Sequence, residues 1–158
     1  MPISVGAKAP NFTLKQKTAD GLKDVTLSDH AGNEPVVLVF FPSVYTGVCT
    51  DEMCDKGGGL AAAMGLGAAV YGISTDSPFA QEAWAKANGI TIPLLSDYDH
   101  SVVRTYDVEW PSFVGIGPSA ARAAVVIGRD GTVKYSEQTP TLGELPDFEK
   151  IKAALAGA

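Results

Sequence analysis

Five segments of the chain are predicted to be strands. They are Val36–Phe41, Ala68–Ser74, Thr91–Leu95, Ala123–Ile127 and Thr132–Tyr135. Unbroken apolar runs such as Val36–Phe41 indicate strands that are covered on both faces. The turn Gly128–Gly131 joins the last two segments and predicts an antiparallel hairpin.

The most clearly marked helix follows the second strand. Asp76 or Ser77 can cap its start, and Pro78 suits the first helical position. Asn88-Gly89 is a typical helix end. These signals predict a helix that begins at Pro78 and ends at Asn88.

Three further helices are expected between or after the strands. One begins at Thr46 or just after it, one covers Ser101–Tyr106 with a cap at Asp99 or nearby, and one covers Phe148–Leu155 after Pro146 or Asp147. Alternating strands and helices with one antiparallel hairpin predict an α/β fold with a mixed central β-sheet and helices on both faces. The length of 158 residues predicts a single domain, residues 1–158.

Charge and hydropathy narrow the expected partners and location. The net charge is −6, and the three arginines and nine lysines are spread along the chain, so no basic face for nucleic acid or for an anionic membrane is expected. The apolar stretch Leu60–Ile73 is shorter than the ~20 residues that span a bilayer and contains three glycines. Met1–Lys8 does not have the pattern of a secretory signal, which predicts a cytoplasmic protein.

The two cysteines, Cys49 and Cys54, follow closely on the strand Val36–Phe41. A strand that leads through a turn into a helix places Cys49 near the helix N-terminus, where backbone N–H groups and the helix dipole stabilise a thiolate. A free cysteine has a pKa of about 8.5, whereas a thiol with a pKa near 6 is mostly ionised at neutral pH. In a reducing compartment, this pair is expected to be catalytic or metal-binding.

A zinc site is the weaker of these two interpretations. Zinc needs four ligands, and His30 and His100 lie far from the cysteines without paired ligand spacing. The Cys-x4-Cys spacing also differs from the Cys-x-x-Cys of disulfide reductases. We therefore expect no metal site.

Pro42, Thr46 and Cys49 resemble the Pro-x-x-x-Thr-x-x-Cys motif of the peroxiredoxins, the alkyl hydroperoxide reductase and thiol-specific antioxidant family, and Glu52 also fits. The resemblance extends over Ala9–Leu14, Gly72–Ser77, Pro93–Asp97 and Arg122–Gly131. It implies a thioredoxin-like fold and the reduction of hydrogen peroxide and organic hydroperoxides by a thiol, as an antioxidant enzyme, without metal, haem or flavin.

The resemblance also implies roles for individual residues. Cys49 would be the peroxidatic nucleophile that becomes a sulfenic acid, Thr46 and Arg122 would activate sulfur and peroxide, and Pro42 would shield the site from water. The residues themselves also allow simpler roles. Thr46 could be a helix cap, Arg122 a surface arginine at a strand edge, and Glu52 an acid favoured by the helix dipole.

Cys54 leaves two alternatives open. Its position five residues after Cys49 resembles the bacterioferritin-comigratory (Q-type) branch, which carries a resolving cysteine in the same helix. On a regular helix, the two Cα atoms would be about 8.7 Å apart, and a disulfide needs less than about 7 Å, so the helix would have to unwind locally. Otherwise Cys54 has no redox role, and an external thiol resolves a one-cysteine peroxidase.

The resemblance implies thioredoxin or a glutaredoxin-like protein as the reductant, and the protein is expected to be a monomer or a homodimer. A redox-sensing interaction module is the non-enzymatic alternative, in which oxidation changes a binding surface. Turnover separates the two, because a sensor reacts once per molecule and a peroxidase reacts repeatedly.

Overall fold

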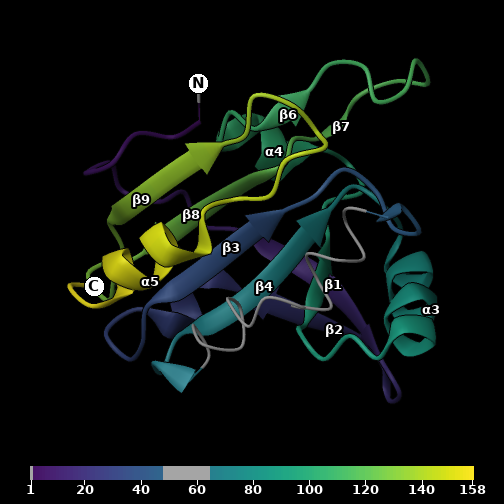
Figure 1. The fold of residues 1–158 in the computed structure, drawn as a ribbon. Coiled ribbons are helices and arrows are strands. Elements are labelled where there is room, and N and C mark those ends of the chain that lie inside the picture. Colours follow the sequence, from purple (N-terminus) through teal and green to yellow (C-terminus); the bar gives the residue numbers. More distant parts are fainter. Residues whose placement is uncertain (1, 48–64) are drawn as a thin grey trace.

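The computed structural model describes residues 2–47 and 65–158. Its main feature is a seven-stranded sheet with the order β2-β1-β5-β4-β3-β8-β9 (Figure 1). These strands are β1 (Thr13–Thr18), β2 (Gly21–Thr26), β3 (Val36–Phe40), β4 (Ala69–Ser74), β5 (Leu94–Ser96), β8 (Ala123–Ile127) and β9 (Val133–Gln138). A small second sheet pairs β6 (Glu109–Trp110) with β7 (Ser119–Ala120).

The buried strand β3 lies at the centre of the sheet. It pairs in parallel with β4 and antiparallel with β8, and all of its residues are buried. The predicted central strand and the predicted hairpin of β8 and β9 are therefore confirmed, and β9 extends to Gln138. The strand expected over Thr91–Leu95 begins only at Leu94, because Pro93 has no N–H group to give to the sheet.

Helices cover both faces of the sheet, as predicted. On one face, α3 (Pro78–Asn88) contributes Trp84 to the core, and α5 (Phe148–Leu155) contributes Ile151 and Leu155. In Figure 1, α5 lies on the near face and α3 at one side of the sheet. On the other face, α4 (Ser101–Thr105) packs through Val102 and Val103.

The ends of the two longer helices match their sequence signals. The Ser77 hydroxyl accepts a hydrogen bond from the Ala80 N–H, and Gly89 ends α3 in the left-handed conformation at φ 65°. The Asp147 carboxylate accepts hydrogen bonds from two backbone N–H groups of the first turn of α5. Local sequence therefore determines where these helices begin and end.

The hairpin of β1 and β2 was not predicted. Its strands carry lysine, threonine and aspartate at most positions, and β2 is an exposed edge strand, so the apolar alternation that indicates a strand is weak. A short 3-10 helix, η1 (Leu27–His30), follows the hairpin and buries Leu27.

Asp97, at the end of β5, caps α4 from inside the protein. Asp99 does accept a hydrogen bond from the Ser101 N–H, as expected for a cap near this position. Asp97 is fully buried and accepts the N–H groups of Val102 at 3.0 Å and Val103 at 2.8 Å. Burial raises the pKa of Asp97, although these two hydrogen bonds act in the opposite direction.

Substitution of Asp97 should therefore destabilise the fold. Asp97→Ala leaves two buried N–H groups without their acceptor and should lower the free energy of unfolding by about 2 kcal/mol. Asp99→Ala is the matched control, because Asp99 is exposed and should cost less. Urea unfolding measures both. An Asp97→Ala variant as stable as Asp99→Ala would contradict the assigned role.

In the described ranges, 2–47 and 65–158, no helix has the length and apolar character needed to cross a membrane.

Candidate active site

The candidate site begins where the chain leaves β3. The Phe41 N–H donates to the Ile73 carbonyl at 3.0 Å and continues the pairing with β4 by one residue. Pro42 comes next, is buried, and has no N–H group to continue this ladder. The Phe41 ring packs against Trp84 of α3, with the ring centroids 5.3 Å apart. The strand end is thus held from both the sheet and the helix side.

Residues 43–47 form the next turn, which we call the motif turn. The Thr46 hydroxyl donates to the Ser43 carbonyl at 3.1 Å, three residues earlier, so threonine stabilises the turn itself. Tyr45 has φ 62°, a conformation that non-glycine residues adopt rarely, and its side chain is exposed. Gly47, the last residue before the gap, is helical, in agreement with a helix start near Thr46. Cys49, Glu52 and Cys54 lie outside the described residues.

Asp76 connects the motif turn to the neighbouring strand end. Its Oδ2 accepts the Val44 N–H at 3.0 Å and the Ser74 hydroxyl at 2.7 Å. Its Oδ1 lies 3.4 Å from the Ser43 hydroxyl. Since Asp76 lies two residues after the end of β4, one carboxylate joins this strand end to the turn that follows β3.

Arg122 is buried, with a relative exposure of 2%. This burial excludes the alternative role of a surface arginine at a strand edge. Its Nε donates to the Leu142 carbonyl at 2.8 Å, and its own carbonyl accepts the Thr139 N–H. Both partners lie in the segment between β9 and α5, and the two hydrogen bonds fix the arginine to this segment.

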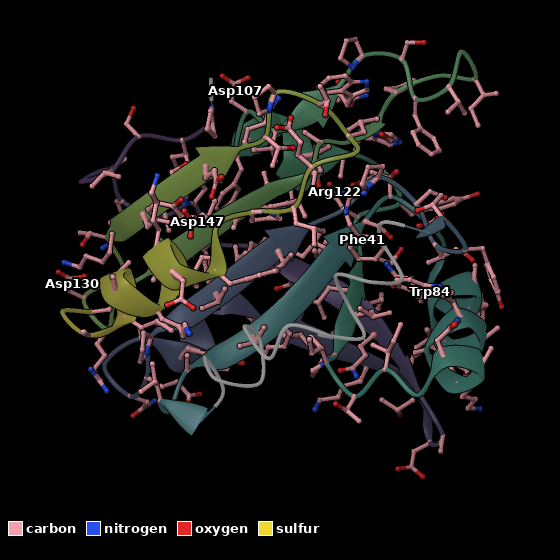
Figure 2. All side chains as sticks on the ribbon, viewed as in Figure 1. Phe41, Trp84, Asp107, Arg122, Asp130 and Asp147 are labelled. Carbon is pink, nitrogen blue, oxygen red and sulfur yellow. The ribbon has the colours of Figure 1, made fainter. Side chains whose placement is uncertain are left out.

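The sheet register brings Arg122 next to the motif turn. Phe40 of β3 pairs with Ala123 of β8, so Arg122 stands opposite Phe41, one residue before Pro42. Figure 2 shows Arg122 and Phe41 together at the carboxyl end of β3. The structure therefore gathers Pro42, Thr46 and Arg122 around the strand end from which the chain continues to Cys49.

The other two arginines lie on the surface. Arg104 in α4 is 60% exposed and pairs with Glu109, and Arg129 is exposed in the turn between β8 and β9. Burial thus distinguishes Arg122 from its two counterparts.

Ser74, Asp76 and Gln81 were not predicted as site residues. Asp76 was considered only as a cap for α3. The sequence did contain a signal for them. The carboxyl ends of neighbouring parallel strands meet at one edge of a sheet, and Ser74 ends the strand next to β3 while Asp76 lies two residues beyond it. Among the described residues, no cluster of three histidine, cysteine, aspartate or glutamate side chains could hold a metal ion.

Comparison with known proteins identifies the family of this site. The model of the AhpC/TSA family matches residues 5–136. The chain is a member of the AhpC/TSA family. It is therefore a peroxiredoxin, an antioxidant thiol peroxidase that uses a peroxide substrate and a thiol reductant.

Individual relatives resemble the peroxiredoxin over nearly its whole length. Alkyl hydroperoxide reductase E of Mycobacterium tuberculosis is 34% identical over 98% of this chain and 97% of its own. A thiol peroxidase of the same organism is 37% identical over 96% of this chain and 88% of its own. The crystal structure of the peroxidoxin BcpB from M. tuberculosis superposes with a TM-score of 0.78 at 27% identity, covering 98% of this chain and 97% of its own. The fold of this peroxiredoxin is accordingly thioredoxin-like, as the sequence resemblance implied.

Proposed function

We propose that Cys49 is the peroxidatic residue of this thiol peroxidase, and that Pro42, Thr46 and Arg122 form the environment in which its thiolate reacts. The observation that carries the proposal is the burial of Arg122 at the strand end from which the chain runs on to Cys49. A permanently charged guanidinium with several N–H donors stabilises anions in its surroundings. Both the reacting sulfur and the departing oxygen are such anions.

The chemistry assigned to Cys49 is nucleophilic displacement at oxygen. The thiolate attacks the distal oxygen of a hydroperoxide, the S–O bond forms as the O–O bond breaks, and the alkoxide or hydroxide leaves and takes up a proton. Cys49 is thereby oxidised to a sulfenic acid, and the peroxide is reduced to an alcohol or water. Arg122 would stabilise the negative charge on the leaving oxygen.

Thr46 and Pro42 have supporting roles in this scheme. The Thr46 hydroxyl donates its hydrogen bond to the Ser43 carbonyl, so its oxygen would act as an acceptor toward the substrate. The O–H group of a hydroperoxide is a donor and would be oriented by that oxygen. Pro42 is buried next to the turn and would keep water from the reacting sulfur.

We further propose that Cys54 resolves the oxidised enzyme. The Cys54 thiolate would attack the Cys49 sulfur, so that the S–S bond forms, the S–O bond breaks, and the oxygen leaves as water after protonation. A dithiol donor, thioredoxin or a glutaredoxin-like protein, would then reduce the disulfide in the cytoplasm. Since the Cα atoms on a regular helix are about 8.7 Å apart, resolution requires local unwinding.

Non-reducing mass spectrometry of the peroxide-treated protein tests this step. Stoichiometric peroxide should produce a disulfide-linked peptide that contains Cys49 and Cys54. The Cys54→Ser variant should instead accumulate a Cys49 sulfenic acid that a dimedone probe traps. A wild-type protein that accumulates sulfenic acid without the linkage would show that an external thiol resolves a one-cysteine peroxidase.

A further inference from the structure

The carboxylate of Asp76 lies between the motif turn and the end of β4. It accepts the Val44 N–H at 3.0 Å within the motif turn, and the Ser74 hydroxyl binds the same oxygen at 2.7 Å. The backbone carbonyl of Asp76 in turn accepts the Ser96 hydroxyl at 2.6 Å. Asp76 is therefore hydrogen-bonded to the motif turn that follows β3 and to the last residues of β4 and β5.

A second layer of buried polar groups holds this carboxylate in place. Ser74 is fully buried and Gln81 is 1% exposed. The Gln81 side-chain amide donates to the Ser74 hydroxyl at 2.9 Å and to the Leu95 carbonyl at 2.8 Å, which links α3 to β4 and β5. Because both the serine and the glutamine are fixed, the orientation of the Asp76 carboxylate is also fixed.

The motif turn needs such an external restraint. Tyr45 stands in the left-handed region at φ 62°, and its exposed side chain makes little contribution to packing. A non-glycine residue keeps this unfavourable conformation only where the surrounding structure imposes it. The Val44 N–H, one residue earlier, is the point at which Asp76 holds the turn.

We propose that Asp76 is a positioning residue of the peroxidase, which fixes the motif turn through Ser43 and Val44 and thereby sets the placement of Thr46 and of the segment that leads to Cys49. Asp76 need not touch the peroxide for this role. The proposal rests on the assignment of Cys49 and Thr46 made under Proposed function. Small errors in the placement of reacting groups reduce rates strongly even when the fold is intact.

Peroxide consumption by Asp76→Ala tests the proposal. The second-order rate constant with hydrogen peroxide, expressed per mole of folded protein and measured well below the unfolding temperature, should fall about tenfold or more. Asp76→Asn keeps an oxygen that can accept the Val44 N–H and should stay within about threefold of wild type. If Asp76→Ala does not fold, Ser74→Ala replaces it, because it removes the hydroxyl that orients the carboxylate, and its rate constant should also fall.

Asp130→Ala is the matched control. Asp130 holds the turn between β8 and β9 through the Thr132 N–H at 3.0 Å and through Lys134 at 2.9 Å, and Figure 2 shows it far from Arg122. Its loss should leave the rate constant at the wild-type value. The proposal is overturned if Asp76→Ala, or Ser74→Ala in its place, has the wild-type rate constant. It is also overturned if the rate constant of Asp76→Asn is as low as that of Asp76→Ala, or if Asp130→Ala lowers the rate constant as much.

Cys49→Ser, measured in the same assay, distinguishes a failure of the positioning role of Asp76 from a failure of the assignment of Cys49 as the peroxidatic residue. An inactive Cys49→Ser with a fully active Asp76→Ala removes only the positioning role. An active Cys49→Ser removes the assignment of the peroxidatic residue, whatever Asp76 does.

Discussion

Replacement of Cys49 by serine is expected to reduce peroxide consumption to the uncatalysed background. A serine hydroxyl has nearly the same size as a thiol but remains un-ionised at neutral pH, and no sulfenic acid can form from it. The measurement is consumption of hydrogen peroxide with excess dithiothreitol as reductant. Dithiothreitol is chosen because it does not depend on a particular protein donor.

Cys54→Ser is the matched control for this experiment. It carries the same chemical change in the same segment of the chain, and it should react with the first equivalent of peroxide at the wild-type rate. If Cys54 resolves the Cys49 sulfenic acid, Cys54→Ser should no longer consume peroxide with thioredoxin as the reductant. Equal loss of the first oxidation in both variants would contradict the distinct roles assigned to the two cysteines.

Replacement of Arg122 should produce the second largest effect. Arg122→Met removes a buried charge and its N–H donors, and we expect kcat/KM for peroxide to fall by about 10²-fold to 10³-fold, which is typical for the loss of one group that stabilises transition-state charge. Arg122→Lys keeps the charge but loses the planar array of donors, so it should recover only part of the rate. Steady-state kinetics at several peroxide concentrations measure both variants.

An Arg122 variant can lose activity because it unfolds, so its stability is measured separately from its rate. The Leu142 carbonyl loses its partner in Arg122→Met, which should lower the free energy of unfolding by about 1–3 kcal/mol. Urea unfolding shows whether the assay contains folded protein. Arg104→Met is the matched control, because Arg104 is 60% exposed and should leave both stability and rate near wild type. Arg122→Met with wild-type kcat/KM would contradict the role of the arginine at the site.

The elements that the sequence predicted correctly are those that depend on local signals. Burial on both faces makes β3 an unbroken apolar run, and Ser77, Pro78 and Gly89 mark the ends of α3 through their own backbone preferences. The hairpin of β1 and β2 was missed because its strands are stabilised by pairing with β5 and with each other, and not by an apolar pattern of their own.

The sequence predicted residue types for the candidate site but not their geometry. The motif resemblance named Pro42, Thr46 and Arg122, but burial of Arg122 depends on the segment around Leu142, which lies twenty residues further along the chain. The role of Asp76 depends in the same way on the pairing of β3 with β4. Contacts between distant segments are fixed by tertiary packing, so local patterns do not reveal them.

The pKa of the Cys49 thiol tests the central claim most directly. In the Cys54→Ser variant, Cys49 is the sole cysteine, and the pH dependence of its alkylation by iodoacetamide reports its ionisation without the use of peroxide. The midpoint should lie below neutral pH, and it should rise in Arg122→Met, because the arginine favours the thiolate. A midpoint near the value of a free cysteine, about 8.5, in both proteins would contradict the claim that this site holds an ionised sulfur.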